Sequence, residues 1–130
     1  MQKTRNLFFD LAIKEAQLAG NRGEVPVGAV ITDSQTGEVV STAGNLVEQN
    51  QDPTAHAEIV VIREASNLIG SRNLKNYDLY VTLEPCPMCA AAISLARIRR
   101  LYFGAFDIKS GGIDHGPKIY THQSCNHIPE

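Results

Sequence analysis

The sequence has 130 residues, of which 43% are hydrophobic and 20% are charged, and its formal net charge is −2. This length suits a single domain with its own core, which we expect over residues 1–130, and the composition excludes a disordered chain. No run of about 18 apolar residues is present, so we expect no membrane-spanning helix and no membrane partner.

The N-terminus does not resemble a secretory signal, because Asp10 and Glu15 appear before any long apolar run. The 3 cysteines are too few for a disulfide framework. Both features favour a reducing cytoplasm, where thiols stay free to bind metal. Residues 86–130 carry five Lys/Arg and three Asp/Glu, a balance of +2, which is compatible with a phosphate-bearing partner or with an ordinary solvated surface.

The first predicted element is an amphipathic helix over residues 4–19, which Gly20 and Gly23 end. Its apolar residues fall near helical spacing: Leu7, Phe8, Leu11, Ala12, Leu18 and Ala19. Residues 25–31 form a β-branched apolar run and are predicted to be a buried strand. Turn residues at 33–37 and a second run at 38–43 complete a predicted hairpin. A polar loop follows, over 44–53.

A second helix is predicted over residues 54–69, capped by Thr54 and ended by Gly70. Its expected inner stripe is Val61, Ala65 and Leu68. Residues 78–83 are predicted to be a central strand. Pro87 then opens a third helix, because proline suits a first helical position.

That third helix is small and is expected to be largely buried through Ala90, Ala91, Ile93, Leu95 and Ala96. Residues 101–105 are predicted to be a strand, and the remainder to be loop with one turn near Ile119. The order αββαβαβ predicts an α/β fold, namely an αβα sandwich with a mixed central sheet of four to five strands flanked by helices.

Three residues in this order have the side chains and the spacing of zinc ligands. His56 lies at the start of the second helix, and Cys86 and Cys89 lie at the start of the third. The i, i+3 spacing places both sulfurs on one helix face, and a helix N-terminus favours thiolate. Three protein donors leave a fourth tetrahedral position for water, which is typical of catalytic rather than structural Zn²⁺ sites.

Glu58 is predicted to be the catalytic proton shuttle beside that position. It would take a proton from the zinc-bound water, which thereby becomes hydroxide. One geometric difficulty arises, because residues i and i+2 lie about 200° apart on an ideal helix. His56 and Glu58 can therefore share a pocket only if that pocket lies against the first turn.

Two other interpretations remain open. Cys86-Pro-Met-Cys89 after a strand also resembles a thioredoxin-like redox motif. A fourth protein ligand would instead make a closed structural zinc site, and the candidates for it are His115, His122, Cys125 and His127.

The motifs resemble those of the bacterial tRNA-specific adenosine deaminases, which have the cytidine deaminase fold and the H-x-E and P-C-x-x-C signature. The resemblance covers most of the chain, in these segments: 24–30, 52–58, 79–86, 96–98, 103–112 and 126–127. It implies hydrolytic deamination of the tRNA wobble adenosine to inosine, one zinc ion per subunit and a homodimer.

The resemblance also assigns roles to residues. It makes His56, Cys86 and Cys89 the zinc ligands and Glu58 the proton shuttle. The remaining matched positions are expected to contact the substrate: Asn45, Val27, Leu83, Pro85, Asp107 and Lys109. Without the resemblance, the sequence would predict a turn residue at Asn45 and a surface turn over the Asp107–Lys109 segment. It would also predict that Val27 and Leu83 are ordinary core residues.

Two features leave the substrate open. Members of this family usually continue past Asn126-His127 with a strand and a long helix, whereas this sequence ends at Glu130, so we expect an open sheet edge. Guanine and cytosine deaminases share the same zinc motif. A deaminase of a free base or nucleoside is therefore the alternative function.

Overall fold

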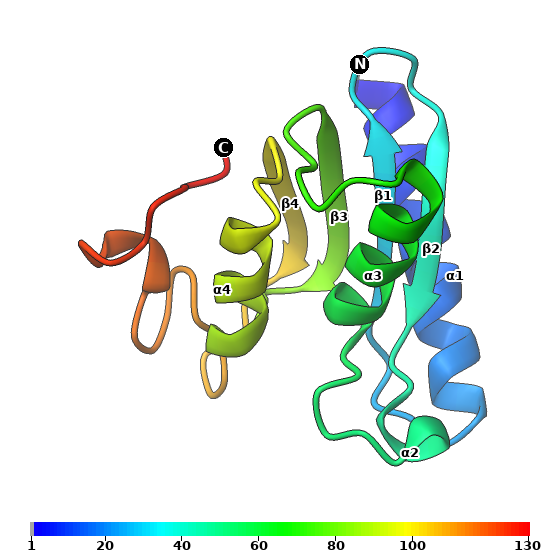
Figure 1. Ribbon diagram of the computed structural model, residues 1–130. Helices are drawn as coiled ribbons and strands as arrows, with labels where there is room; N and C mark the ends of the chain where they lie inside the picture. Colours follow the sequence, from blue (N-terminus) through cyan, green and yellow to red (C-terminus); the bar gives the residue numbers. More distant parts are fainter. Residues whose placement is uncertain (1) are drawn as a thin grey trace.

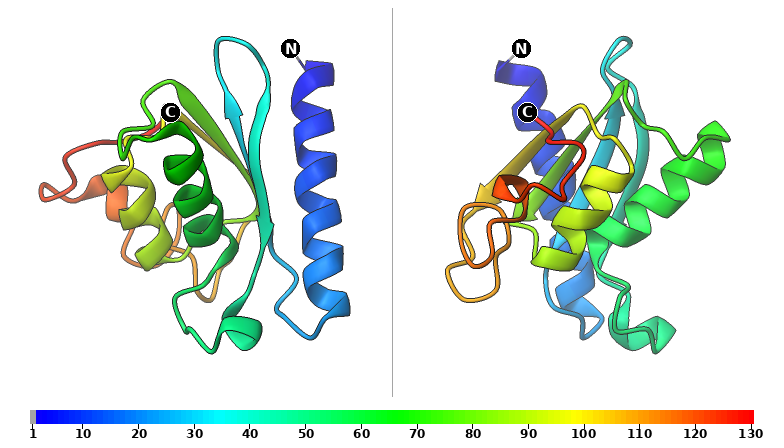
Figure 2. Two further views of the ribbon diagram at one scale, coloured as in Figure 1. Left: turned by 45° about the vertical axis from the view of Figure 1, so that its right-hand side comes forward. Right: turned by 60° about the vertical axis from the view of Figure 1, so that its left-hand side comes forward.

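The polypeptide folds into three layers in the computed structural model, which describes residues 2–130 (Figure 1). A four-stranded sheet forms the middle layer, with α1 on one face and α3 and α4 on the other (Figure 2). The elements are α1 (Gln2–Asn21), β1 (Gly28–Asp33), β2 (Val39–Gly44), α2 (Val47–Asn50), α3 (Ala57–Ile69), β3 (Tyr77–Leu83), α4 (Pro87–Leu95), β4 (Arg100–Ala105) and the 3-10 turn η1 (Ile119–Thr121). The predicted αβα sandwich is confirmed.

The strand order is β2-β1-β3-β4, and the sheet is mixed. Strand β1 runs antiparallel to β2 and to β3, whereas β3 and β4 run parallel. The predicted hairpin is therefore present as β1 and β2. Strands β3 and β4 are parallel, and β1 runs opposite to β3. The C-terminal ends of β3 and β4 and the start of β1 therefore lie at the same end of the sheet.

Strands β1 and β3 fill the core, which lies mainly between the sheet and the helices α3 and α4. Helix α1 covers the opposite face through Phe8, Ala12 and Ala19. Three residues of its predicted apolar stripe are instead exposed, namely Leu7, Leu11 and Leu18. The prediction was wrong for them because α1 packs on a single sheet, so only one row of its side chains is covered.

Two other predicted core residues are also exposed, Leu68 in α3 and Leu95 in α4. Both lie in the last turn of their helices. Helical spacing identifies residues that share a row, but the row's distance from the sheet at a helix end depends on packing.

The helix boundaries confirm some local signals and correct two. Gly20 does not end α1, which continues to Asn21. Gly70 ends α3 in the left-handed conformation at φ 77°, and Pro87 stands in the first turn of α4. Thr54, however, does not cap α3. Its hydroxyl donates to Asp52 Oδ1 at 2.7 Å, and the N-cap residue of α3 is His56. The polar loop before it contains the short helix α2.

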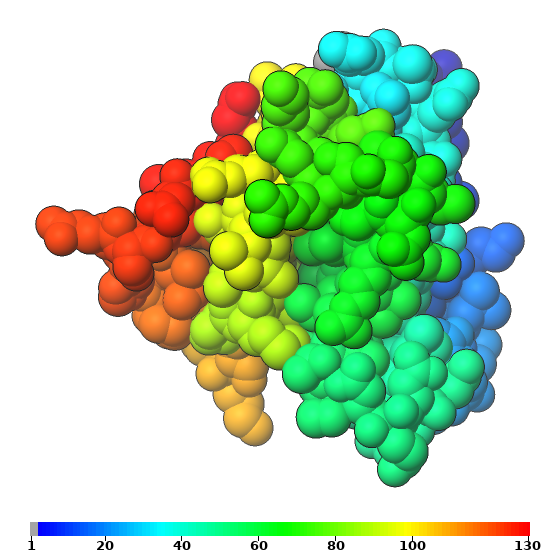
Figure 3. All heavy atoms as spheres, in the orientation of Figure 1, coloured from blue at the N-terminus to red at the C-terminus, as the bar shows by residue number. Residues whose placement is uncertain are grey.

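The C-terminal segment lies beside α4 and projects from the body of the molecule (Figure 3). Its last residue returns to the outer edge of β4, where Leu101 N donates to Glu130 O at 2.7 Å and Glu130 N donates to Arg99 O at 3.0 Å. Strand β4 is thus an edge strand that meets Glu130 only at its start. Among the described helices, none is both long and apolar enough to cross a lipid bilayer.

Gly28 sits where α1 approaches the sheet most tightly, and this makes a first prediction. A Cβ atom at Gly28 would lie 1.9 Å from Ala12 O and 2.6 Å from Ala16 N. Both atoms are backbone, so the whole helix must shift. We expect Gly28→Ala to lower the free energy of unfolding by about 3 kcal/mol, measured by urea denaturation. Gly20→Ala is the matched control, since its Cβ would meet a side-chain atom, Pro26 Cβ, at 3.3 Å, and it should lower stability far less than Gly28→Ala.

Candidate active site

Three metal-binding side chains converge where the N-termini of α3 and α4 meet. His56 is the N-cap residue of α3, Cys86 is the N-cap residue of α4, and Cys89 lies in the first turn of α4. Their donor atoms lie within 4.8 Å of one another, and within residues 2–130 this is the His/Cys/carboxylate cluster that could hold a metal ion.

The spacing of the donors fits a tetrahedral zinc ion. With Zn–S near 2.3 Å and Zn–N near 2.05 Å, tetrahedral angles place a nitrogen and a sulfur ligand about 3.6 Å apart. His56 Nδ1 lies 3.6 Å from Cys86 Sγ and 3.5 Å from Cys89 Sγ. One imidazole and two thiolates are a known donor set of catalytic zinc. The residues therefore fit the metal in chemistry and in distance.

The backbone around His56 resolves the difficulty of the i, i+2 spacing. His56 has extended dihedrals, φ −67° and ψ 153°, and helix α3 begins only at Ala57. The 200° separation between helical residues i and i+2 therefore does not apply to His56 and Glu58. Both residues line the same cavity, as required for joint action.

Glu58 is a buried carboxylate beside the metal donors, with only 4% of its surface exposed. Burial disfavours its charged form and raises the pKa of Glu58 to about 7. A carboxyl group in this range can both accept and release a proton near neutral pH.

The two thiols are coupled to each other. A hydrogen bond from Cys89 lowers the pKa of the Cys86 thiol to about 5, and the same hydrogen bond raises the pKa of Cys89. Thiolate at Cys86 is further favoured by the N-terminus of α4, and a coordinated cation would deprotonate both thiols.

The four side chains considered as a fourth metal ligand all have other partners. His115 Nδ1 lies 2.7 Å from Glu84 Oε1, His122 Nε2 lies 2.6 Å from Pro117 O, Cys125 Sγ donates to His127 O at 3.2 Å, and His127 Nε2 lies 2.7 Å from Ile98 O. The donor set within residues 2–130 is therefore His56, Cys86 and Cys89. A thioredoxin-like disulfide pair would not need the imidazole that lies against both sulfurs.

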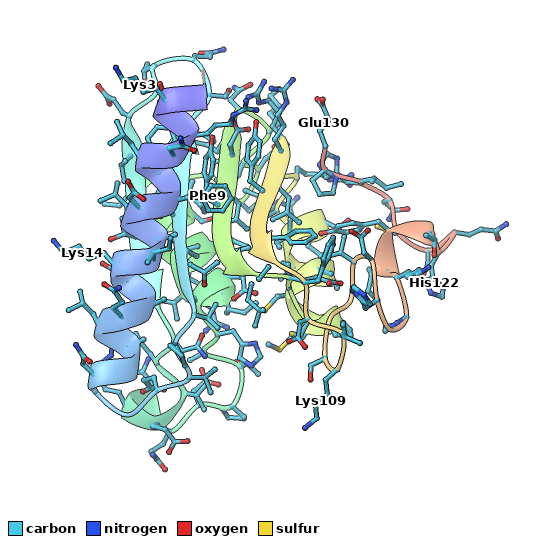
Figure 4. The ribbon with its side chains drawn as sticks, turned by 180° about the vertical axis from the view of Figure 1, so that it is seen from behind. Lys3, Phe9, Lys14, Lys109, His122 and Glu130 are labelled. Carbon is cyan, nitrogen blue, oxygen red and sulfur yellow. The ribbon has the colours of Figure 1, made fainter. Side chains whose placement is uncertain are left out.

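A cavity of about 360 Å³ opens beside the metal donors and is large enough for a small ligand. Of the predicted substrate contacts, Val27, Asn45, Leu83 and Asp107 line it. Pro85 is fully buried and lies outside the lining. Lys109 also lies outside it, at the tip of the loop that follows β4, and its side chain points away from the molecule (Figure 4).

Asn45 has a structural role that the sequence did not indicate. Its Oδ1 accepts a hydrogen bond from Ala57 N at 2.7 Å, so it caps α3 from outside the helix. The carboxamide oxygen is thereby engaged, and the group left for the cavity is the NH2, which can only donate. Asn45 therefore both sets the start of α3 and presents a donor to a ligand.

Two buried carboxylates near the cavity were also missed. Glu24 accepts hydrogen bonds from Glu48 N at 3.0 Å and Gln49 N at 2.9 Å, which secures α2 at the cavity wall. Burial acts to raise the pKa of Glu84, but hydrogen bonds from His115 and from loop amides outweigh it and lower the pKa to about 2. Glu84 lies in segment 79–86, which carries the resemblance, but the sequence assigned no role to its side chain.

Comparison with known proteins agrees with this geometry. Residues 2–105 match the family described as the cytidine and deoxycytidylate deaminase zinc-binding region. The chain is 51% identical over 126 residues to a tRNA-specific adenosine deaminase of Agrobacterium fabrum, a match that covers 97% of this chain and 82% of the relative. A Bacillus subtilis tRNA-specific adenosine deaminase is 50% identical over 124 residues, covering 95% and 76%.

Among solved structures, a tRNA deaminase is likewise more similar to this chain than a guanine deaminase is. A chain from a study of A-to-I editing by tRNA:A34 deaminases at the wobble position has a TM-score of 0.94 and 51% identity, covering 97% of this chain and 95% of that chain. Guanine deaminase from Bacillus subtilis has a TM-score of 0.75 and 32% identity, covering 96% and 82%.

Proposed function

The chain belongs to the cytidine and deoxycytidylate deaminase family, and from its similarity to tRNA-specific members we propose that it deaminates adenosine to inosine at the wobble position of tRNA. It is a zinc-dependent hydrolytic deaminase. The observation that carries the choice of substrate is its 51% identity, over 97% of its length, to a tRNA-specific adenosine deaminase.

The site residues divide the chemistry between them. His56, Cys86 and Cys89 hold the zinc ion, which when bound lowers the pKa of a water molecule and so supplies a nucleophile at neutral pH. Glu58 would take a proton from the attacking water and deliver it to the purine ring nitrogen N1 as the C6–O bond forms. Glu58 would then carry the proton of the new C6 hydroxyl group to the amine, and the C6–N bond would break. Adenosine and water thus become inosine and ammonia.

The cavity wall orients the base. Val27 and Leu83 offer apolar surfaces to the ring, and Asn45 offers its NH2 to an acceptor on the nucleoside. Asp107 approaches from the loop after β4. Pro85 does not reach the cavity, and its carbonyl instead holds the loop by accepting from Gly112 N at 2.8 Å. Lys109, outside the cavity, is suited to contact the RNA phosphate backbone.

The broader properties are proposals as well. Residues 1–130 act as one deaminase domain, supported by a single sheet with one main core. The protein works in the cytoplasm, which the three free cysteines support.

It forms a homodimer, for which the exposed Leu95 beside the C-terminal segment offers an apolar contact. Light scattering after gel filtration should give twice the 14.2 kDa chain mass.

The test of function compares substrates on purified, metal-analysed protein. We expect an anticodon stem-loop with adenosine at the wobble position to yield inosine, detected by nucleoside mass spectrometry. The same stem-loop with guanosine at that position is the control and should remain unchanged.

Free guanine is the second candidate substrate, because a guanine deaminase shares the fold at 32% identity. Ammonia release from guanine or cytosine, together with an unmodified stem-loop, would replace the proposed function by a small-molecule deaminase.

A further inference from the structure

One buried carboxylate holds both ends of the loop that follows β4. Glu84 Oε1 accepts a hydrogen bond from Asp107 N at 3.1 Å and lies 2.7 Å from His115 Nδ1. Glu84 follows β3 directly and Asp107 follows β4 closely, and the two strands are parallel. Glu84 therefore holds both ends of loop 107–115 at the C-terminal end of β3, where the turn that carries Cys86 also begins.

The second oxygen of Glu84 occupies a concavity of backbone amides. Oε2 accepts from Ile113 N at 3.2 Å, Asp114 N at 2.9 Å and His115 N at 3.1 Å. Successive amides of this kind normally bind anions, and here the anion is a side chain of the protein. The Glu84 side chain is 0% exposed, so removal of the carboxylate would leave these buried amides without their acceptor.

The loop also lies tightly against the turn that carries Cys86. A Cβ atom at Gly111 would lie 2.5 Å from Glu84 Oε2, and one at Gly112 would lie 2.6 Å from Pro87 N. Only glycine allows this approach. The loop thus packs directly on the metal-ligating turn and has little room to change its path.

The other side of the loop faces the substrate cavity. Asp107 and Ser110 line the cavity together with Cys86 and Glu58. The metal ligands and Glu58 lie instead on or beside α3 and α4. The loop is therefore a wall of the cavity that carries none of the metal ligands.

We propose that Glu84 and His115 form a positioning pair, which holds loop 107–115 in the shape that binds the substrate. This inference rests on the proposed function, because it assigns the loop to binding of the same substrate. Loss of the His115 hydrogen bond loosens one end of the loop, whereas the metal site and the proton shuttle remain in place. The Michaelis constant therefore rises while the turnover number changes little.

The experiment compares His115→Ala with His115→Asn. The Asn Nδ2 group occupies nearly the position of His Nδ1 and can donate to Glu84, whereas alanine cannot. The centroid of the His115 ring lies 5.5 Å from that of Phe106, and asparagine lacks this ring. The asparagine variant therefore separates the effect of the hydrogen bond from that of ring packing. His122→Ala is the matched control, because this exposed histidine lies outside loop 107–115 and its Nε2 lies 2.6 Å from Pro117 O.

We expect His115→Ala to raise KM for the stem-loop about tenfold, with kcat within about threefold of the wild type and one zinc ion per chain. His115→Asn should restore KM, and His122→Ala should resemble the wild type. Amides 113–115 should exchange faster with deuterium in the His115→Ala variant only.

Three results would overturn the positioning role: an unchanged KM in His115→Ala, an equal rise in His115→Ala and His115→Asn, or loss of zinc from His115→Ala. Failure of the wild type to edit the stem-loop would contradict the proposed function instead. The KM comparison would then use the free base that the wild type deaminates, so the two failures remain distinct.

Discussion

Replacing Glu58 by glutamine is expected to lower kcat for deamination by about 10²–10⁴-fold while zinc stays bound. Glutamine has nearly the size of glutamate but cannot take up and release a proton. Glu58 is not one of the three metal donors, so the metal site should keep its ligands. Single-turnover assays on the stem-loop and zinc analysis of the same preparation would measure both quantities.

The matched control for this change is Glu64→Gln, which removes a carboxylate from the exposed face of the same helix, α3. Its rate should equal that of the wild type. Since glutamine at position 58 also relieves the burial of a charge, the free energy of unfolding should stay the same or increase. A Glu58→Gln enzyme that keeps most of its activity would contradict the role of Glu58 as the proton shuttle.

Replacing Cys89 by alanine should remove stoichiometric zinc and, with it, deamination. Cys89 is fully buried and its sulfur lies 3.5 Å from His56 Nδ1, so alanine removes one of the three donors and leaves only two to hold the ion. Because the metal is the source of the nucleophile, the loss of rate should exceed the upper end of the Glu58 effect, about 10⁴-fold. Metal analysis and the stem-loop assay would be performed together.

Cys125→Ala is the control for this loss, because Cys125 is the remaining cysteine and bonds to His127 O rather than to the metal donors. It should retain one zinc ion per chain and wild-type turnover. Chelation of the wild type should reproduce the Cys89→Ala rate, and added zinc should restore it. Loss of zinc from the Cys125 variant would show a fourth protein ligand and contradict an open catalytic site.

The elements that local signals predicted well are those with strong start and stop residues. Pro87 opens α4, Gly70 ends α3, and the turn at 33–37 joins the hairpin. Each signal acts through the conformational limits of one or two residues, so it is readable without knowledge of distant contacts. The metal donors were predictable for the same reason, since their spacing is set by a helix start.

The start of α3 was not predictable in this way. The predicted cap was Thr54, whereas the structure begins the helix at Ala57, whose amide is held by Asn45 Oδ1. Asn45 comes from the loop after β2, 12 residues earlier in the chain. This later start is what allows His56 and Glu58 to face one cavity.

The path of loop 107–115 was likewise hidden from the sequence. Its shape depends on Glu84, which is separated from its hydrogen-bond donors by 23 to 31 residues. The face of α1 that packs on the sheet has the same origin. Phe8 and Leu7 are adjacent in sequence and equally apolar, yet only Phe8 reaches the aromatic cluster around Tyr80.

By itself, the sequence determined the donor set of His56, Cys86 and Cys89, the class of reaction, and most of the secondary structure. These properties depend on residue type, on local spacing and on the resemblance to a known family, whereas the meeting of His56 with cysteines 30 and 33 residues away required the tertiary structure. Only the tertiary structure decided that Glu58 shares a cavity with the metal donors and that Glu84 closes the loop beside it. Burial and the hydrogen bonds of buried groups depend on contacts between segments far apart in the chain, and such contacts exist only once the layers have packed.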